Sequence, residues 1–90
     1  MSQADIKSAV VAALETVAPE TDPAAIDEAT SLRDALDLDS MDFLNFLVAL
    51  HASLGVSVPE AEYSRMRTMR DAVAYLSERL AAPGVAPRPR

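Results

Sequence analysis

The chain has 90 residues, enough for one small domain whose folding buries roughly 60–65% of the surface that the unfolded chain exposes. Half of the residues are apolar and the net charge is −6, which argues against disorder throughout and against nucleic acid as a partner. The absence of cysteine excludes disulfides, thiolate zinc sites and cysteine nucleophiles. Because no apolar run reaches the roughly 18 residues of a membrane span and no signal-peptide pattern is present, we expect a cytoplasmic protein without membrane insertion.

The charge is unevenly distributed along the chain. Residues 15–42 contain nine acidic residues and a single basic one, Arg33, whereas residues 65–90 contain six arginines and two acids. An acidic region of this kind steers basic partners toward it. The alternative interpretation is a surface that is merely well solvated.

The first predicted helix covers residues 5–17, and Pro19 follows its end. Its apolar residues recur at spacings of four, four and three, which is one stripe of a helix with 3.6 residues per turn. The stripe consists of Ile6, Val10, Leu14 and Val17. This helix therefore contributes one apolar face to a core.

Residues 18–39 form a connection that is too long to lack structure in a compact domain. Asp22 followed by Pro23 is typical of a helix cap and first helical position, and Ser31 with Asp34 forms a capping-box pattern. We therefore expect short helical turns in this connection. Three leucines are available to anchor it on the core: Leu32, Leu36 and Leu38.

The second long helix is predicted over residues 40–54, with Gly55 as its C-cap. Its apolar residues cover more of the circumference than one core contact requires, so the helix is either central in the fold or has part of its surface reserved for a partner or ligand. These residues are Met41, Phe43, Leu44, Phe46, Leu47, Val48, Leu50 and Leu54.

A short helix is predicted over residues 60–65, and a last helix begins at Thr68, a cap followed three residues later by Asp71. The fold class is therefore all-α, a monomeric four-helix bundle with three long helices, one short helix and a long loop between the first two. Its predicted core is Ile6, Val10, Leu14, Leu32, Phe46, Leu47, Leu50, Leu54, Val73, Leu76 and Leu80, and Met69 is expected on the buried stripe of the last helix.

Ser40 stands at the start of the second long helix, among Asp37, Asp39 and Asp42. A capping role is the simplest interpretation, but Asp39 is the better cap, which leaves the serine hydroxyl facing water. A hydrolase is excluded on geometry, because His51 lies eleven residues along the same helix, roughly 16 Å away. No metal site is expected. Covalent modification by a phosphodiester is a third interpretation, because a helix N-terminus stabilises a negative phosphate. The carboxylates would then form a recognition surface for a basic modifying enzyme.

The stretch "LDLDSMDFLNFLVAL", together with the preceding "IDEATSLRDAL", resembles the acyl carrier proteins and their peptidyl-carrier relatives. The order of elements matches over about residues 4–81. The resemblance implies a carrier domain over residues 1–82, a flexible tail over 83–90 and no catalytic residue. It also implies that Ser40 carries 4′-phosphopantetheine, transferred from coenzyme A with magnesium by a phosphopantetheinyl transferase. The thiol of this arm would hold acyl or aminoacyl groups as thioesters.

The sequence also departs from this family. Met41 replaces the leucine of the usual Asp-Ser-Leu hallmark, and the helix lacks the several glutamates of fatty acid synthase carriers. We therefore expect a specialised carrier of lipid or secondary metabolite biosynthesis, loaded by its own ligase, synthase or transferase. The alternatives are a general fatty acid synthase carrier and a non-covalent helical interaction module. The residues predicted to recognise partners are Asp37, Asp39, Met41, Asp42, Phe43 and Val48.

Overall fold

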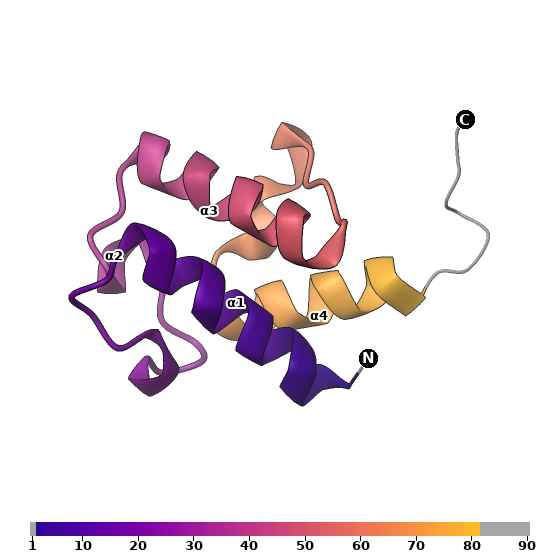
Figure 1. The fold of residues 1–90 in the computed structure, drawn as a ribbon, viewed down its shortest axis with the longest axis horizontal. Helices are drawn as coiled ribbons and strands as arrows, with labels where there is room; N and C mark the ends of the chain where they lie inside the picture. Colours follow the sequence, from indigo (N-terminus) through magenta and orange to yellow (C-terminus); the bar gives the residue numbers. More distant parts are fainter. Residues whose placement is uncertain (1, 82–90) are drawn as a thin grey trace.

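Three long helices form the bundle, and the first of them, α1 (Gln3–Val17), packs along both of the others (Figure 1). The computed structural model describes residues 2–81. Within this range no strand forms, so the predicted all-α class is confirmed. The remaining elements, in chain order, are η1 (Pro23–Ala25), α2 (Leu32–Ala35), α3 (Ser40–Leu54), η2 (Glu60–Met66) and α4 (Met69–Ala81).

Helix α1 begins two residues earlier than predicted because Ser2 and Asp5 form a capping box. The Asp5 amide donates to Ser2 Oγ over 3.1 Å, and the Ser2 amide donates to Asp5 Oδ2 over 3.3 Å. This reciprocal pair satisfies two of the amides that a helix start leaves without partners. The predicted stripe is correct at its centre, where Ile6, Val10 and Leu14 are buried.

The connection between α1 and α3 contains the expected helical turns. Asp22 makes no capping hydrogen bond, so Pro23 alone marks the start of η1. Ser31 caps α2 by accepting the amide of Asp34, although the reciprocal half of the predicted box is absent. The three leucines expected to anchor the connection are buried. After α2, Asp37 adopts a left-handed conformation (φ 54°), which aspartate tolerates better than most residues, and the chain turns into α3.

Hydrogen bonds tie the connection to the start of α4. Ser31 and Thr68 form an isolated antiparallel bridge, and the Leu32 amide donates to the Arg67 carbonyl over 2.8 Å. The Arg70 amide donates to the Glu28 carbonyl over 3.1 Å. The position of α2 is therefore fixed by residues from the last third of the chain.

The core confirms most of the prediction and corrects α4. Leu80 is 39% exposed and Val73 is only half-buried, whereas Ala72 and Tyr75 are buried. Val73 and Leu80 are seven residues apart and lie together at the edge of the buried stripe, because the helix turns Tyr75 toward the core. Leu54, at the end of α3, is also half-buried.

Two further predictions concern membrane insertion and the end of the chain. No helix within residues 2–81 is long and apolar enough to cross a membrane. The predicted tail over residues 83–90, and the domain boundary at residue 82, lie outside the described residues.

Candidate functional site

Ser40 is the first residue of α3, and its neighbours make the helix cap without it. Asp39 is the N-cap: its Oδ1 accepts the amide of Asp42 over 2.8 Å, while Asp42 Oδ2 accepts the amide of Asp39 over 3.3 Å. The local sequence Asp-Ser-Met-Asp thus forms a complete capping box around an exposed serine. The hydroxyl of Ser40 is therefore free of the role that serines most often have at a helix start.

A polar side chain that reaches that hydroxyl is Arg33, from α2. Its Nη2 atom lies 3.5 Å from Ser40 Oγ, across the turn that contains Asp37. The guanidinium carbon lies 5.6 Å from the centroid of the Phe43 ring, within the range of a cation–π contact. One arginine thus bridges the exposed hydroxyl and a buried aromatic ring.

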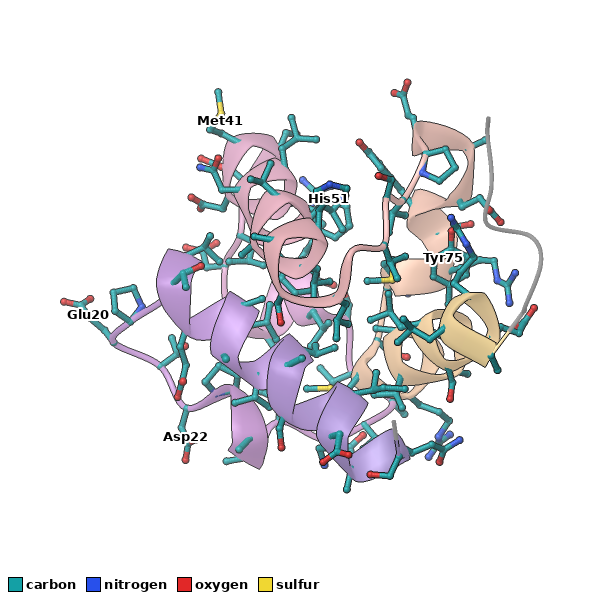
Figure 2. All side chains as sticks on the ribbon, turned by 45° about the vertical axis from the view of Figure 1, so that its right-hand side comes forward. Glu20, Asp22, Met41, His51 and Tyr75 are labelled. Carbon is teal, nitrogen blue, oxygen red and sulfur yellow. The ribbon has the colours of Figure 1, made fainter. Side chains whose placement is uncertain are left out.

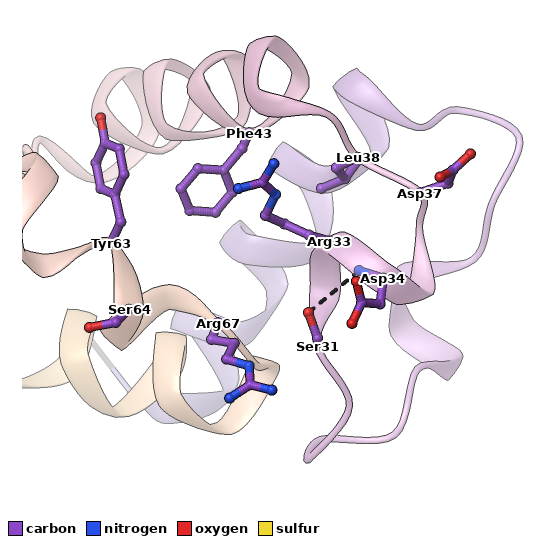
Figure 3. A pocket seen from close by; sticks show the side chains of 9 residues that line it. All are labelled: Ser31, Arg33, Asp34, Asp37, Leu38, Phe43, Tyr63, Ser64 and Arg67. Atoms are coloured by element: carbon purple, nitrogen blue, oxygen red, sulfur yellow. Dashed lines mark hydrogen bonds between the residues drawn. The ribbon is translucent and has the colours of Figure 1, made fainter.

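Two adjoining cavities open beside this group. The cavity that includes Ser40 has a volume of about 460 Å³ and shares Arg33, Phe43 and Tyr63 with a larger one of about 610 Å³. Figure 3 shows Arg33 extending in front of the Phe43 ring, and Tyr63 and Arg67 are among the other residues that line the larger cavity. The hollow beside Ser40 is therefore lined by both aromatic and cationic groups.

Phe43, which was predicted to help in partner recognition, is buried in the structure. The ring is only 5% exposed and packs against Phe46 and, edge-to-face, against Tyr63, whose centroid lies 5.4 Å away. Phe43 is thus a wall of the cavities and has almost no surface to offer a partner.

The exposed apolar surface of α3 consists instead of Met41, Leu44 and Val48, which are 64%, 43% and 67% exposed. Their spacings of three and four place them on one face of the helix, beginning beside Ser40. Figure 2 shows Met41 projecting outward from the start of α3. Leu44 was missing from the predicted surface, although its spacing from the other two residues could have identified it.

The acids near Ser40 are available to a partner. Asp37 and Asp39 are exposed, Asp42 is half-buried, and none of them takes part in the three ion pairs found within residues 2–81. Those pairs lie elsewhere, joining Lys7 to Glu28 and Arg65 to two glutamates. Within residues 2–81, no lysine or arginine therefore forms an ion pair with any of these three acids.

The polar groups between η2 and α4 differ in this respect. Tyr75 of α4 donates to Glu62 over 3.1 Å and accepts from Arg79 over 2.7 Å. Burial is the main cause that raises the pKa of Tyr75 above its usual value. The pKa of Arg65 is also raised, chiefly by its hydrogen bond to Glu78. Polar groups here satisfy one another, which indicates a structural role.

His51 lies at the other end of α3 from Ser40. Its Nδ1 is 3.0 Å from Ser57 Oγ, beyond the end of the helix. No group of three or more metal-ligating side chains gathers within residues 2–81. Within this range, neither His51 nor a cluster of metal-ligating side chains lies beside the serine.

Comparison with known proteins agrees with this arrangement. A family model described as "Phosphopantetheine attachment site" matches residues 8–76. The acyl carrier protein of Myxococcus xanthus is 33% identical over 73 residues, covering 78% of this chain and 92% of that protein. The acyl carrier protein of Lactobacillus acidophilus is 35% identical over 57 residues, covering 63% and 71%. That of Petrotoga mobilis is 30% identical over 67 residues, covering 74% and 76%. The chain belongs to the acyl carrier protein family, whose phosphopantetheine-attachment domain carries a covalently bound 4′-phosphopantetheine.

Proposed function

We propose that Ser40 is the attachment residue for 4′-phosphopantetheine and that the chain presents acyl or aminoacyl thioesters to other enzymes. The observation that carries this proposal is the capping box of Asp39 and Asp42, which leaves an exposed serine hydroxyl at a helix N-terminus. Free amides and the helix dipole at this position favour a phosphate. The cavity beside Ser40 offers open space next to the hydroxyl. These residues fit the group that the family carries.

In this proposal the chain supplies a nucleophile and a surface, and its partners supply the catalysis. Ser40 Oγ forms the new bond to phosphorus, coenzyme A loses its adenosine bisphosphate portion, and the hydroxyl proton passes to a base of the phosphopantetheinyl transferase. The chain has no cysteine, so the thiol that holds the cargo belongs to the arm. We propose that the chain acts as a monomer in the cytoplasm.

The proposed recognition surface combines charge and apolar contact. Asp37, Asp39 and Asp42 attract basic partner enzymes, while the strip formed by Met41, Leu44 and Val48 is covered when a partner docks. Exposed charge pairs are individually weak, about 0–1 kcal/mol, so the acids act mainly by raising the association rate.

Attachment is tested by incubating the protein with coenzyme A, magnesium and a promiscuous transferase, followed by intact-mass measurement. The wild type should gain one arm, and Ser40→Ala should gain none while its helical circular dichroism stays native. Ser53→Ala, which changes an exposed serine on the same helix, is the matched control and should be modified normally. An arm on Ser40→Ala, or none on the wild type, would contradict the proposal. The second outcome would favour the non-covalent interaction module.

We further propose a specialised carrier of lipid or secondary metabolite biosynthesis. The support is the composition of α3, in which Asp42 is the only acid between Met41 and Leu54. Enzymes of general fatty acid synthesis that dock on acidic residues along this helix should therefore bind weakly. Malonyl transferase of the fatty acid pathway should load the holo protein poorly, compared with a ligase encoded near it. Efficient malonylation and elongation would instead identify a general fatty acid synthase carrier.

A further inference from the structure

The Arg33 guanidinium lies beside the candidate attachment residue, and the capping of α3 does not involve it. We propose that Arg33 is a binding residue for the phosphodiester of the arm, donating from its guanidinium to the phosphate oxygens once Ser40 is modified. This inference rests on the proposed attachment at Ser40. It adds a specific anion contact and explains why an acidic segment contains one arginine.

The distance between Arg33 and Ser40 favours an anion over the bare hydroxyl. Nη2 is 3.5 Å from Ser40 Oγ, which is long for a hydrogen bond to a neutral oxygen. In a phosphodiester at Ser40, Oγ is bonded to phosphorus, and the two anionic oxygens are bonded to that phosphorus atom. A planar guanidinium with several donors matches such an oxygen pair better than it matches one hydroxyl.

The side chain of Arg33 is also held in place. Its guanidinium lies over the ring of Phe43, which is buried and packed against Tyr63. Its backbone belongs to α2, where Ser31 caps the helix and the Leu32 amide bonds to the Arg67 carbonyl. A preorganised arginine loses less side-chain entropy when it binds a ligand than a freely moving one.

The charges around Arg33 give the third argument. It is the only basic residue within residues 15–42, and it makes none of the ion pairs found within residues 2–81. An arginine that served only to neutralise the neighbouring acids would pair with one of them. Glu60, which also lines the cavity, would repel a phosphate, and Arg33 is the basic residue among the residues that line it.

The test follows the arginine side chains and the phosphorus directly. Protein labelled with ¹⁵N-arginine is converted from apo to holo, and the guanidinium Nε–H resonances and the ³¹P resonance are recorded at low and high salt. The Arg33 signal should move on conversion, whereas that of Arg67, which lines the same hollow away from Ser40, should not. Arg33→Gln should shift the ³¹P resonance and remove its salt dependence. Arg33→Lys should restore part of that dependence, and Arg67→Gln should change neither.

Intact mass separates the possible failures. One outcome is that the mass rises by one arm while conversion leaves the Arg33 signal unchanged and substitution of Arg33 leaves the ³¹P signal unchanged. In that case the proposed arginine contact is wrong, and attachment at Ser40 stands. If Arg67→Gln changes the ³¹P resonance as much as Arg33→Gln does, the contact is a diffuse charge effect and the inference is overturned. If the mass never rises, both proposals fail together.

Discussion

Helix α3 carries apolar residues on two faces, and the bundle covers only one of them. Phe46 and Leu50 on the inner face are fully buried, whereas Met41 and Val48 on the outer face are about two-thirds exposed. The two faces are similar in composition, but only the inner one loses its contact with water on folding. The inner face therefore contributes to stability, and the outer face keeps exposed apolar surface of the kind that intermolecular contacts use.

The largest expected effect distinguishes the faces by stability. Leu50→Ala removes a fully buried side chain and should lower the free energy of unfolding by about 2–5 kcal/mol. Val48→Ala on the outer face should change it by no more than about 0.5 kcal/mol. Urea unfolding monitored by circular dichroism gives both values. Equal losses in the two variants would show that the outer face is not free.

The next effect concerns the acids at the end of α3 where both faces begin. Replacing Asp39 and Asp42 together by asparagine removes two charges, and asparagine remains a good N-cap at position 39. We expect arm attachment by the transferase to slow about tenfold at low ionic strength, because steering is lost. The difference from the wild type should shrink as salt is added. A slowing that is independent of salt would indicate a structural cause instead.

A smaller effect should separate outer-face contact from charge. Met41→Gln and Val48→Gln keep a helix-compatible side chain while removing exposed apolar surface. Each should raise the KM of the transferase about fivefold, roughly 1 kcal/mol of lost burial, without the salt dependence of the aspartate variants. The free energy of unfolding of each variant should stay within about 0.5 kcal/mol of the wild-type value. The control is Ser53→Gln on an exposed position near the far end of α3, which should leave the KM unchanged.

The smallest effect lies away from both faces, at Tyr75. Tyr75→Phe removes hydrogen bonds with Glu62 and Arg79 and should cost about 0.5–1 kcal/mol at neutral pH. Because the folded state raises the pKa of Tyr75, its stabilising contribution is present below the usual pKa of 10.0. It is lost as the pH rises through the folded-state pKa. Between neutral and strongly alkaline pH, the free energy of unfolding should fall more steeply in the wild type than in Tyr75→Phe. Arm attachment at neutral pH should be equal in both.

The sequence predicted the helix boundaries that depend on local chemistry. Asp39, Gly55 and Thr68 act within three or four residues of themselves, so their capping roles could be read before any packing was known. Ser2 is equally local, and its pairing with Asp5 would have placed the start of α1 correctly.

The features that the sequence did not predict depend on distant contacts. Tyr75 is buried and its hydroxyl donates to Glu62, thirteen residues earlier in the chain, whereas Leu80 is 39% exposed. Phe43 is buried because Tyr63 packs against its ring. The contact of Arg33 with Ser40 crosses a turn with a left-handed aspartate, and no periodic pattern indicates it.

The bridge between Ser31 and Thr68 has a consequence for the order in which the molecule assembles. Helix α2 has only four residues, too few to persist alone in water, and it is held by Arg67 through the Leu32 amide. Arg33 therefore reaches its position only after the start of α4 has docked. During synthesis the chain could form α3 and expose Ser40 early. The Arg33 side chain would take its place beside Ser40 only after the last third of the sequence had been made. The contact between Arg33 and Ser40 thus indicates that the whole domain has folded.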